Sequence, residues 1–519
     1  MNTSLIPFVY SLAIALLVIV VSYAFDKKIS HSSSRHFLFI LTLLLFIAVG
    51  IQRLSIIPLT GHVVDSSATV NILWNTVNGR LWFSDLIGMN FLGYHPFYNI
   101  IFIIPFFLVN SSVFFLESVQ CITSLSCSII VYFLAQQILR DKIVSATCAT
   151  IFLLYPPMAG WSANALEPQV FSVPFLLGAL LALEKKSLFW FICMSTSAAF
   201  SIETFLTAVP LLACIAGIIY FRRASAKLLI FALIVVGLAA IHFIIIQPAC
   251  MPTDGLQPSI AFHYSALGNS KREILMTILT DPVRLARVVL IPGKIGFVAH
   301  LLLPWLFLPL LAPWALIPAI PELVMILLSN PGDDMYKINC FYTQVGTCFI
   351  MWGALHGLKK VTDFFPLFLP LSTHNNRIVR AIVTGLLALS IGLQANYFHT
   401  LGRGIFSLSF DHILPSSPIA GIEIPQDAKI IVTQGPLATW FATQPVIYPN
   451  NNNVTRFAQN RFISGEWIPD YIVGLKEETN EGMKILNDVK MRYNIQLDRQ
   501  TDLISIYKVV SPRIGVNDE

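Results

Sequence analysis

The feature that most constrains this chain is a series of long apolar runs, each able to cross a bilayer as a helix. A hydrocarbon core takes about 20 apolar residues per helix. About a dozen runs of the 519-residue sequence qualify, near residues 5–25, 37–58, 113–139, 143–160, 169–184, 187–203, 204–221, 227–247, 295–311, 313–329, 342–358 and 378–398. Only 12% of the residues are charged, against about 25% in soluble domains. The sequence therefore predicts an all-α polytopic membrane protein with about 12 transmembrane helices.

The basic residues between the runs indicate which side of the membrane each loop faces, because Lys and Arg gather in cytoplasmic loops. Their clusters lie at residues 27–35, 140–142, 185–186, 222–227, 359–360 and 377–380. All of them fall on one face if residues 98–109 do not cross the membrane. That segment is short and contains Pro105, so we expect a juxtamembrane helix there.

The other polar segments are then external. They are the first external loop 59–112, the short loop 161–168, the second large external loop 248–294, the loop 330–341 and the tail from 399. The formal net charge is only +5, and the basic residues are scattered over span ends. No basic stripe of the kind that binds nucleic acid is present.

The tail differs in composition from the transmembrane domain, residues 1–398. Strand patterns occur at 429–434, 445–449 and 470–475, a helical pattern at 477–493, and a hairpin pattern at 493–510. Residues 399–519 are therefore expected to form a small extracytoplasmic α/β domain. The tail sequence contains no Gly-rich phosphate loop, so we expect a support or recognition module.

The stretch HVVDSSATVNILWNTVNGR, residues 62–80, places a lone carboxylate just after the second apolar run. Asp65 is the first acid since Asp26. Apolar residues then recur at helical spacing, with Asn71, Asn75 and Asn78 opposite. We expect a helix along the membrane boundary with its Asn face toward a cavity. Asp65, or Ser66 beside it, could cap this helix, and Asp65 could also act as a general base or hold a metal.

Two other acids lie at span ends on the outer side. Glu167, in WSANALEPQVF, could be a solvated loop acid, the cap residue before Pro168, or a second carboxylate at the depth of Asp65. Glu203, in AFSIETFLTAV, lies where two apolar runs meet. An acid so near hydrocarbon needs a partner, which could be a neighbouring hydroxyl, on Ser201 or Thr204, or a cation.

Histidines and basic residues of the external loops complete the set of candidates. His95 and His263 are flanked by aromatic and small residues and are either structural or substrate-binding; no HExxH spacing points to zinc. The bases are Arg80, Lys271, Arg284 and Arg287. They could contact anionic headgroups or clamp the phosphate of a lipid-linked substrate.

Several stretches together resemble a known family. They are VDSSATVNILWNTVNGRLWFSD, LGYHPFYNIIFIIPFF, FHYSALGNS, FLPLLAPWALIPAIPELVMILLS and IPQDAKIIVTQGPLATWFATQPVIYP. From about residue 60 to 510 the chain resembles the bacterial membrane proteins grouped as domain of unknown function 2079. The family's acidic signature after the fourth span looks like the Glu167 stretch. Its Lys-Glu-Asp triplet is similar to Ser201-Ile202-Glu203, where only the Glu is kept, so no role for a Lys or Asp carries over.

This family in turn resembles the GT-C membrane glycosyltransferases, which take a sugar from a polyprenyl phosphate on the outer face. The resemblance implies juxtamembrane helices in the first external loop, here 66–84 and 97–109. It also implies one acid in that loop and a second in the next. Asp65 would be the base or a metal-holding carboxylate, and Glu167 would position the acceptor or the metal.

The chemistry of glycosyl transfer assigns the remaining residues. The reaction needs a base for the acceptor hydroxyl and stabilisation of the departing phosphate. Lys271, Arg284 or Arg287 would hold that phosphate. The other substrate-binding candidates are Arg80, His95, Glu203 and His263. Mg²⁺ or Mn²⁺ could bind at Asp65 and Glu167, and one carboxylate base predicts an inverting displacement.

The expected setting is the bacterial inner membrane, a plasma membrane, with the tail outside. The partners would be the bilayer, a polyprenyl-phosphate sugar donor and a glycan or lipid acceptor. Two alternatives stay open. A transporter or flippase would show paired halves, which the sequence lacks. A non-catalytic scaffold would use the external tail to bind a partner.

Overall fold

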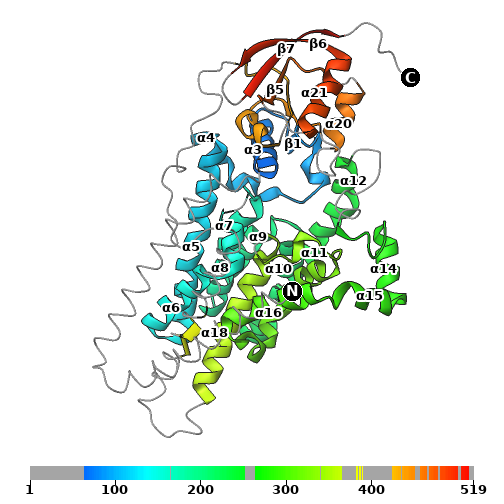
Figure 1. The fold of residues 1–519 in the computed structure, drawn as a ribbon. Coiled ribbons are helices and arrows are strands. Elements are labelled where there is room, and N and C mark those ends of the chain that lie inside the picture. Colours follow the sequence, from blue (N-terminus) through cyan, green and yellow to red (C-terminus); the bar gives the residue numbers. More distant parts are fainter. Residues whose placement is uncertain are drawn as a thin grey trace.

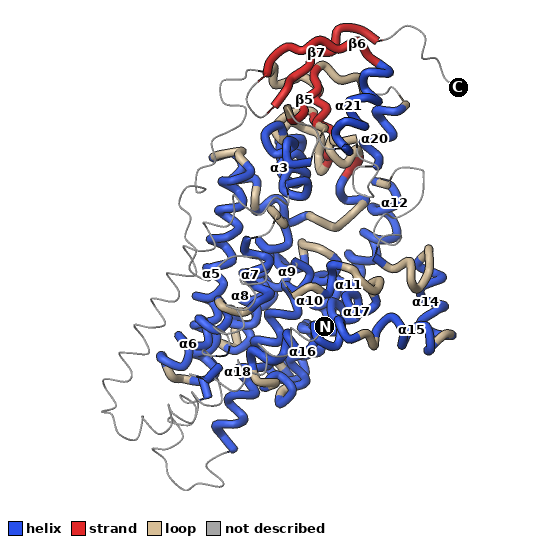
Figure 2. Tube along the Cα trace, viewed as in Figure 1, coloured by secondary structure: helices blue, strands red, loops and turns tan. Residues whose placement is uncertain are grey.

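The computed structural model describes residues 63–163, 165–251, 263–338, 341–364, five positions between 382 and 389, and 424–512 with gaps at 434, 450–455, 465–466, 477–479 and 501–503. The runs expected to span near 5–25 and 37–58 lie outside the described residues, as does nearly all of the run near 378–398. Figure 1 shows a long helical part with a small unit of strands and helices at one end. In Figure 2 the longer strands gather only at that end.

Three described helices are long and apolar enough to cross a bilayer: Val113–Leu139, Glu203–Tyr220 and Arg222–Cys250. A fourth results if Pro282–Val289 and Pro292–Trp305, which meet at 58°, count as one span. Shorter apolar helices lie at Lys142–Leu153, Pro168–Glu184, Leu188–Ala199 and Pro313–Leu328. The chain is thus a helical membrane protein, and the count of about 12 spans stays a prediction.

The helices between residues 113 and 250 follow the expected runs. They are α5 (Val113–Leu139), α6 (Lys142–Leu153), α7 (Pro156–Ala163), η4 (Pro168–Ser172), α8 (Val173–Glu184), α9 (Leu188–Ala199), α10 (Glu203–Ile215), the π-helix η5 (Ala216–Tyr220), η6 (Arg222–Ala224), α11 (Ser225–Ile241), the π-helix η7 (His242–Ile246) and α12 (Gln247–Cys250). α5 packs against α6 and α8, and α10 packs against α11. Leu229, Ile230 and Leu233 of α11 are more than half exposed, as lipid-facing side chains would be.

Local chemistry explains several of these boundaries. Ser112 caps α5 and Asp141 caps α6, each accepting bonds from backbone N–H groups of the first turn. Arg140 between them has φ 57°, the left-handed conformation that commonly ends a helix. The run expected at 143–160 is divided into α6 and α7 because Pro156 disfavours the α conformation in the residue before it.

In the second half of the helical part, the helices are shorter and are interrupted more often. Its elements are α14 (Lys271–Thr280), α15 (Pro282–Val289), α16 (Pro292–Leu302), η8 (Leu303–Trp305), η9 (Leu308–Leu311), η10 (Pro313–Ala319), α17 (Ile320–Leu328), η11 (Asp334–Tyr336), η12 (Phe341–Thr343) and α18 (Gln344–Phe364). α18 packs against η9 and η10. A Cβ at Gly357 of α18 would overlap the carbonyl oxygen of Leu308, so this crossing needs glycine.

The first external loop forms a compact series of short elements. They are α3 (Val63–Val77), β1 (Phe83–Ser84), β2 (Met89–Asn90), η2 (Phe91–Gly93), η3 (Tyr98–Phe102) and α4 (Ile104–Val109). β1 pairs with β2 in antiparallel register. α3 ends where Gly79 takes φ 89° and the N–H of Arg80 bonds the carbonyl of Asn75 at 2.8 Å. Helices are thus present at both places where the sequence predicts them.

Two expectations for α3 are wrong. The helix includes Val63, so Asp65 and Ser66 lie inside its first turn and neither is the N-cap. Asn71 and Asn75 are both fully buried, so this part of the Asn face packs against protein and lines no open cavity. Buried amides need hydrogen-bond partners, and those partners come from distant parts of the chain.

The C-terminal unit contains a five-stranded sheet with order β4-β3-β5-β7-β6. Its elements are β3 (Ile430–Val432), η15 (Gly435–Phe441), β4 (Val446–Ile447), α20 (Arg456–Ile463), β5 (Tyr471–Leu475), α21 (Asn480–Arg492), β6 (Tyr493–Gln500) and β7 (Ile504–Pro512). β3 is parallel to β4 and β5, and β7 is antiparallel to β5 and β6. The predicted strands, helix and hairpin are confirmed, and the domain boundaries at 398 and 399 stay predictions.

Candidate functional site

Ser66 joins α3 to the segment that carries Glu167. Its hydroxyl donates to Oε1 of Glu117 in α5 at 2.5 Å and accepts the N–H of Leu166 at 2.7 Å. Thr69, one turn further along α3, donates to the carbonyl of Leu166 at 3.1 Å. The residue after Asp65 is therefore bonded to the residue before Glu167.

Gln120 of α5 holds the same segment from the other side. Its Oε1 accepts the N–H of Glu167 at 2.6 Å, and its Nε2 donates to the carbonyl of Ala165 at 2.9 Å. Glu167 is the N-cap of η4 with Pro168 at the first position, as the sequence predicts, but its side chain makes no capping bond. The carboxyl is only 6% exposed, so the expectation of a solvated loop acid is wrong.

The surroundings of Glu167 favour its protonated form. Burial raises the pKa of Glu167 well above the ordinary range, and the nearby charge of Asp65 raises it further, against a smaller opposite effect of Gln169. Asp65 itself is exposed. One carboxyl that faces solvent thus lies within electrostatic reach of one that is buried and holds its proton.

Glu203, at the start of α10, pairs with His95. Nδ1 of His95 lies 3.0 Å from Oε1 and 3.2 Å from Oε2 of the carboxylate. Glu203 thus has a side-chain partner, and because a histidine is a cation only when protonated, the expected cationic partner stays a prediction. The hydroxyls of Ser201 and Thr204, the alternative partners, make no hydrogen bond within the described residues.

Tyr94 connects the two pairs. Burial raises the pKa of its phenol, and the charges of Asp65, Glu203 and Glu167 add to the shift. All three acids therefore lie within electrostatic reach of one neutral hydroxyl. We call Asp65, Tyr94, His95, Glu167 and Glu203 the acidic cluster.

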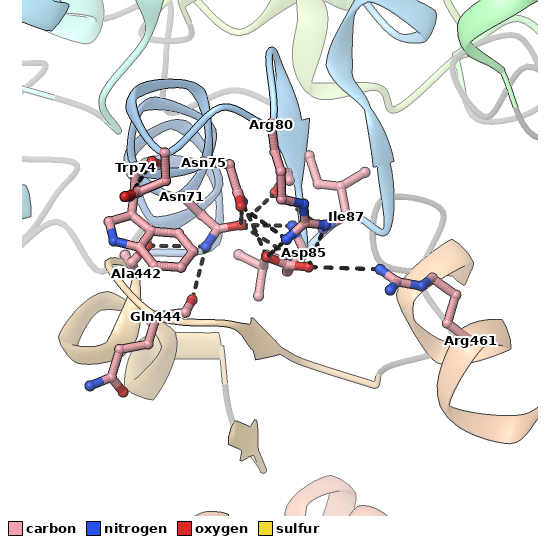
Figure 3. Close-up of polar contacts among 12 residues, drawn as sticks. Asn71, Trp74, Asn75, Arg80, Asp85, Ile87, Ala442, Gln444 and Arg461 are labelled. Carbon is pink, nitrogen blue, oxygen red and sulfur yellow. Dashed lines mark hydrogen bonds and ion pairs between the residues drawn. The ribbon is translucent and has the colours of Figure 1, made fainter. Parts of the chain in front are cut away.

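A second buried carboxyl, Asp85, lies where the first external loop meets the C-terminal unit (Figure 3). Arg80 donates to both of its oxygens, at 3.0 and 3.1 Å, and Asn75 donates at 3.1 Å. Arg461 of α20 approaches to 3.8 Å. Asn71 donates to carbonyls of the C-terminal unit at 3.1 Å. We call Asn71, Asn75, Arg80, Asp85 and Arg461 the Asp85 cluster.

The other predicted residues lie elsewhere. His263 bonds Asp333 at 2.8 Å. Burial alone would raise the pKa of Asp333, but the hydrogen bond with His263 helps to lower it. Lys271, Arg284 and Arg287 are exposed on α14 and α15, which Figure 1 shows well apart from α3. The structure does not bring these three bases to Asp65, and their role as a phosphate clamp stays a prediction.

Within the described ranges, no group of three or more His, Cys, Asp or Glu side chains is arranged to hold a metal ion. Asp65 and Glu167 alone remain as the candidate ligand pair. The donor set is oxygen only, which suits Mg²⁺ or Mn²⁺ better than a soft metal. The metal expectation therefore stays a prediction on these two residues.

Sequence reasoning assigned no role to Tyr94, Gln120, Asp85 and Arg461, and it expected other roles for Ser66, Asn71 and Asn75. Gln120 had a readable signal, because a buried amide inside an apolar run needs a partner. Tyr94 stands next to His95 in the quoted stretch LGYHPFYN. No local pattern indicated that Asp85 would meet Arg461.

The fold is similar to that of a solved membrane protein. It resembles ArnT from Cupriavidus metallidurans in the apo state, with TM-score 0.51 and 10% identity over 90% of this chain and 97% of that chain. The ArnT structure bound to undecaprenyl phosphate gives TM-score 0.50 with the same identity and coverage. At 10% identity, this likeness concerns the fold alone.

The family follows from the sequence match. The chain matches the model described as "Predicted membrane protein (DUF2079)" over residues 64–500 and belongs to that family. No curated protein matches the chain. The predicted family membership is thereby confirmed.

Proposed function

We propose that this protein is a membrane glycosyltransferase that uses a polyprenyl-phosphate-linked sugar on the outer face of a bacterial inner membrane. The observation that carries the proposal is the pairing of exposed Asp65 with buried Glu167. Two carboxyls whose environments differ in this way are suited to opposite acid–base roles. The likeness to ArnT, which was solved with undecaprenyl phosphate, supports the donor class.

In the proposed reaction Asp65 is the base. It takes the proton of the acceptor hydroxyl as that oxygen attacks the anomeric carbon, and the bond from this carbon to the phosphate oxygen breaks. Glu167, protonated because burial raises its pKa, donates a hydrogen bond that positions the acceptor. A single base and direct displacement invert the anomeric configuration.

A divalent cation fits the same pair. Mg²⁺ is commonly held by one or two carboxylates together with substrate phosphates, and Asp65 and Glu167 supply that number. These two residues would hold the ion, which would neutralise charge on the phosphate. Because a cation favours ionised carboxyls, its binding would release the proton that Glu167 otherwise retains.

The C-terminal unit belongs on the same side of the membrane as the acidic cluster. It contacts α3 through Asn71, whose amide donates to the carbonyls of Ala442 and Gln444. An outer-face site therefore implies an extracytoplasmic, and in a Gram-negative cell periplasmic, C-terminal unit.

The test compares membranes from cells that lack the protein with membranes that carry wild type, Asp65→Asn or Asp334→Asn. Asp334 is an exposed outer-loop acid paired with Lys337 and is the matched control. Mass spectrometry measures polyprenyl-phosphate sugars and envelope glycans. We expect Asp65→Asn to slow transfer by about 10²–10⁴-fold, the usual contribution of a general base, and Asp334→Asn to behave as wild type. Equal glycans and equal donor pools in all four membranes would refute the proposal.

A further inference from the structure

The acidic cluster poses an electrostatic problem for an anionic donor. A sugar phosphate would enter beside several carboxyls, and a buried or half-buried anion needs a cationic or hydrogen-bonding partner. Neither Glu167 nor Glu203 is paired with a Lys or Arg in the described part of the chain. The basic helices α14 and α15 lie apart from α3 (Figure 1). The one side chain of the cluster able to carry positive charge is His95.

Glu203 and two aromatic rings surround the ring of His95 and fix its position. Both carboxylate oxygens of Glu203 face Nδ1, which fixes a proton on that nitrogen. Phe97 stacks on the ring with centroids 5.3 Å apart, and Tyr94 meets it edge-on at 4.4 Å. Carboxylates and aromatic faces both favour a cation.

The second ring nitrogen of His95 is available to a ligand. Among the described residues Nε2 makes no hydrogen bond, whereas Nδ1 makes two contacts with Glu203. The side chains of His95 and Glu203 are 30% and 28% exposed, so the pair is open in part to a solute. An imidazolium Nε2–H is a charge-assisted donor of the kind that binds phosphate oxygens strongly.

The backbone and the neighbouring groups hold His95 in this place. A Cβ at Gly93 would lie 2.8 Å from the carbonyl oxygen of Cys250, so the preceding turn packs directly on α12. His242 of η7 faces the same region, with its Nδ1 2.9 Å from the hydroxyl of Tyr98. Among the described residues, the titratable groups around His95 are Glu203, Tyr94 and His242, with Asp65 and Glu167 next to Tyr94.

We propose that His95, whose Nδ1 contacts Glu203, binds the phosphate of the polyprenyl-linked donor as an imidazolium, through Nε2–H. This assignment rests on the proposed function and gives His95 the task that the sequence suggested for Lys271, Arg284 or Arg287. As the bond between the anomeric carbon and the phosphate oxygen breaks, the electron pair stays on that oxygen. Nε2–H of His95 donates to the phosphate that carries the new charge, while the acceptor proton goes to Asp65.

The test measures binding of undecaprenyl phosphate, undecaprenol and phosphatidylglycerol to the purified full-length protein in nanodiscs between pH 5.5 and 8.5. For wild type we expect preference for the phosphate monoester over undecaprenol. His95→Gln should weaken monoester binding about tenfold across this pH range. His95→Arg, whose charge is permanent, should restore binding, a result that a purely structural histidine would not give. His300→Gln, outside the acidic cluster, is the matched control.

The outcomes separate this inference from the proposed function. If wild type does not prefer the monoester to undecaprenol, the donor class is wrong and both proposals fail. If wild type binds the monoester and His95→Gln binds it equally, only the role of His95 is refuted. Equal binding of phosphatidylglycerol would assign His95 to lipid headgroups and also refute the role. Where His95→Gln fails to fold, His95→Arg decides: monoester binding at the wild-type level supports the role of His95, and loss of that binding refutes it.

Discussion

Asp85 and Glu167 are both buried carboxyls on the same side of the helical part, yet their surroundings are opposite. Asp85 is 2% exposed and bonded by Arg80 and Asn75, with Arg461 nearby. Glu167 is 6% exposed and lies near another acid, Asp65. Burial alone therefore does not distinguish a structural acid from a reactive one. The two kinds of acid differ in whether a cationic or hydrogen-bonding partner compensates the charge of the carboxyl.

The difference assigns separate tasks to the two carboxyls. A buried charge with complete partners fixes the geometry of the elements it joins, and Asp85 joins the first external loop to α20 (Figure 3). A buried acid without a cation is kept protonated, a state that clusters at functional sites. The following predictions test this contrast.

The largest effect is expected from Asp85→Ala. This change leaves Arg80 and Asn75 without their shared acceptor and should lower the free energy of unfolding by about 3–5 kcal/mol, the usual result of breaking a buried pair. Unfolding in detergent, followed by tryptophan fluorescence, measures it. Asp498→Ala removes an exposed pair with Arg499 and should cost at most about 1 kcal/mol. Equal losses in both variants would contradict a structural role for Asp85.

Glu167→Gln should raise the free energy of unfolding, the opposite effect to that of Asp85→Ala. Because the pKa of Glu167 is raised in the folded state, the folded protein keeps a proton that the unfolded chain releases above the ordinary carboxyl range. Wild-type stability therefore falls as pH rises from that range toward the raised pKa, by up to about 1.4 kcal/mol per pH unit from this group. Because Gln does not ionise, the Glu167→Gln variant does not lose stability in this way.

The measurement for Glu167→Gln is the difference in unfolding free energy from wild type at pH 5, 6, 7 and 8. We expect the Glu167→Gln variant to be more stable than wild type, by a difference in unfolding free energy that grows with pH. Asp498→Asn, at an exposed acid, should give a difference that stays flat. A flat difference for Glu167→Gln as well would mean that Glu167 is ionised in the folded state.

The smallest effect is expected from Arg461→Gln. The guanidinium is 3.8 Å from Asp85 and its side chain is 27% exposed, so it adds less than the bidentate Arg80. We expect a loss of at most about 1 kcal/mol, with the C-terminal unit still docked through Asn71. Limited proteolysis of that unit should be unchanged. Rapid cleavage near residue 424 would show that Arg461, and not Asn71, holds the unit in place.

The sequence predicted best what depends on neighbouring residues. α5 has the bounds of its apolar run, and the β6–β7 hairpin follows α21 as expected, because periodicity and caps act within a few residues. It also identified Glu203 as an acid in need of a partner, which the structure shows to be His95. These are local consequences of composition.

The sequence predicted least what depends on distant contacts. Ser66 meeting Leu166, and Asp85 meeting Arg461, each join parts of the chain that no pattern relates. The burial of Asn71 could not be read from α3 alone, since its partners are carbonyls of the C-terminal unit. A polar stripe on a helix predicts a polar neighbour and leaves open whether that neighbour is water or protein.

Asn71 also sets an order of assembly. A ribosome makes α3 long before Ala442 and Gln444, and until those carbonyls reach the same side of the membrane the amide of Asn71 lacks two of its acceptors. The helix that carries Asp65 therefore reaches its final packing only after most of the chain has been synthesised. A nascent or truncated chain that ends before residue 442 would insert into the membrane without the contacts between α3 and the C-terminal unit. The helix that carries Asp65 of the acidic cluster would gain these contacts only when the last part of the chain is made.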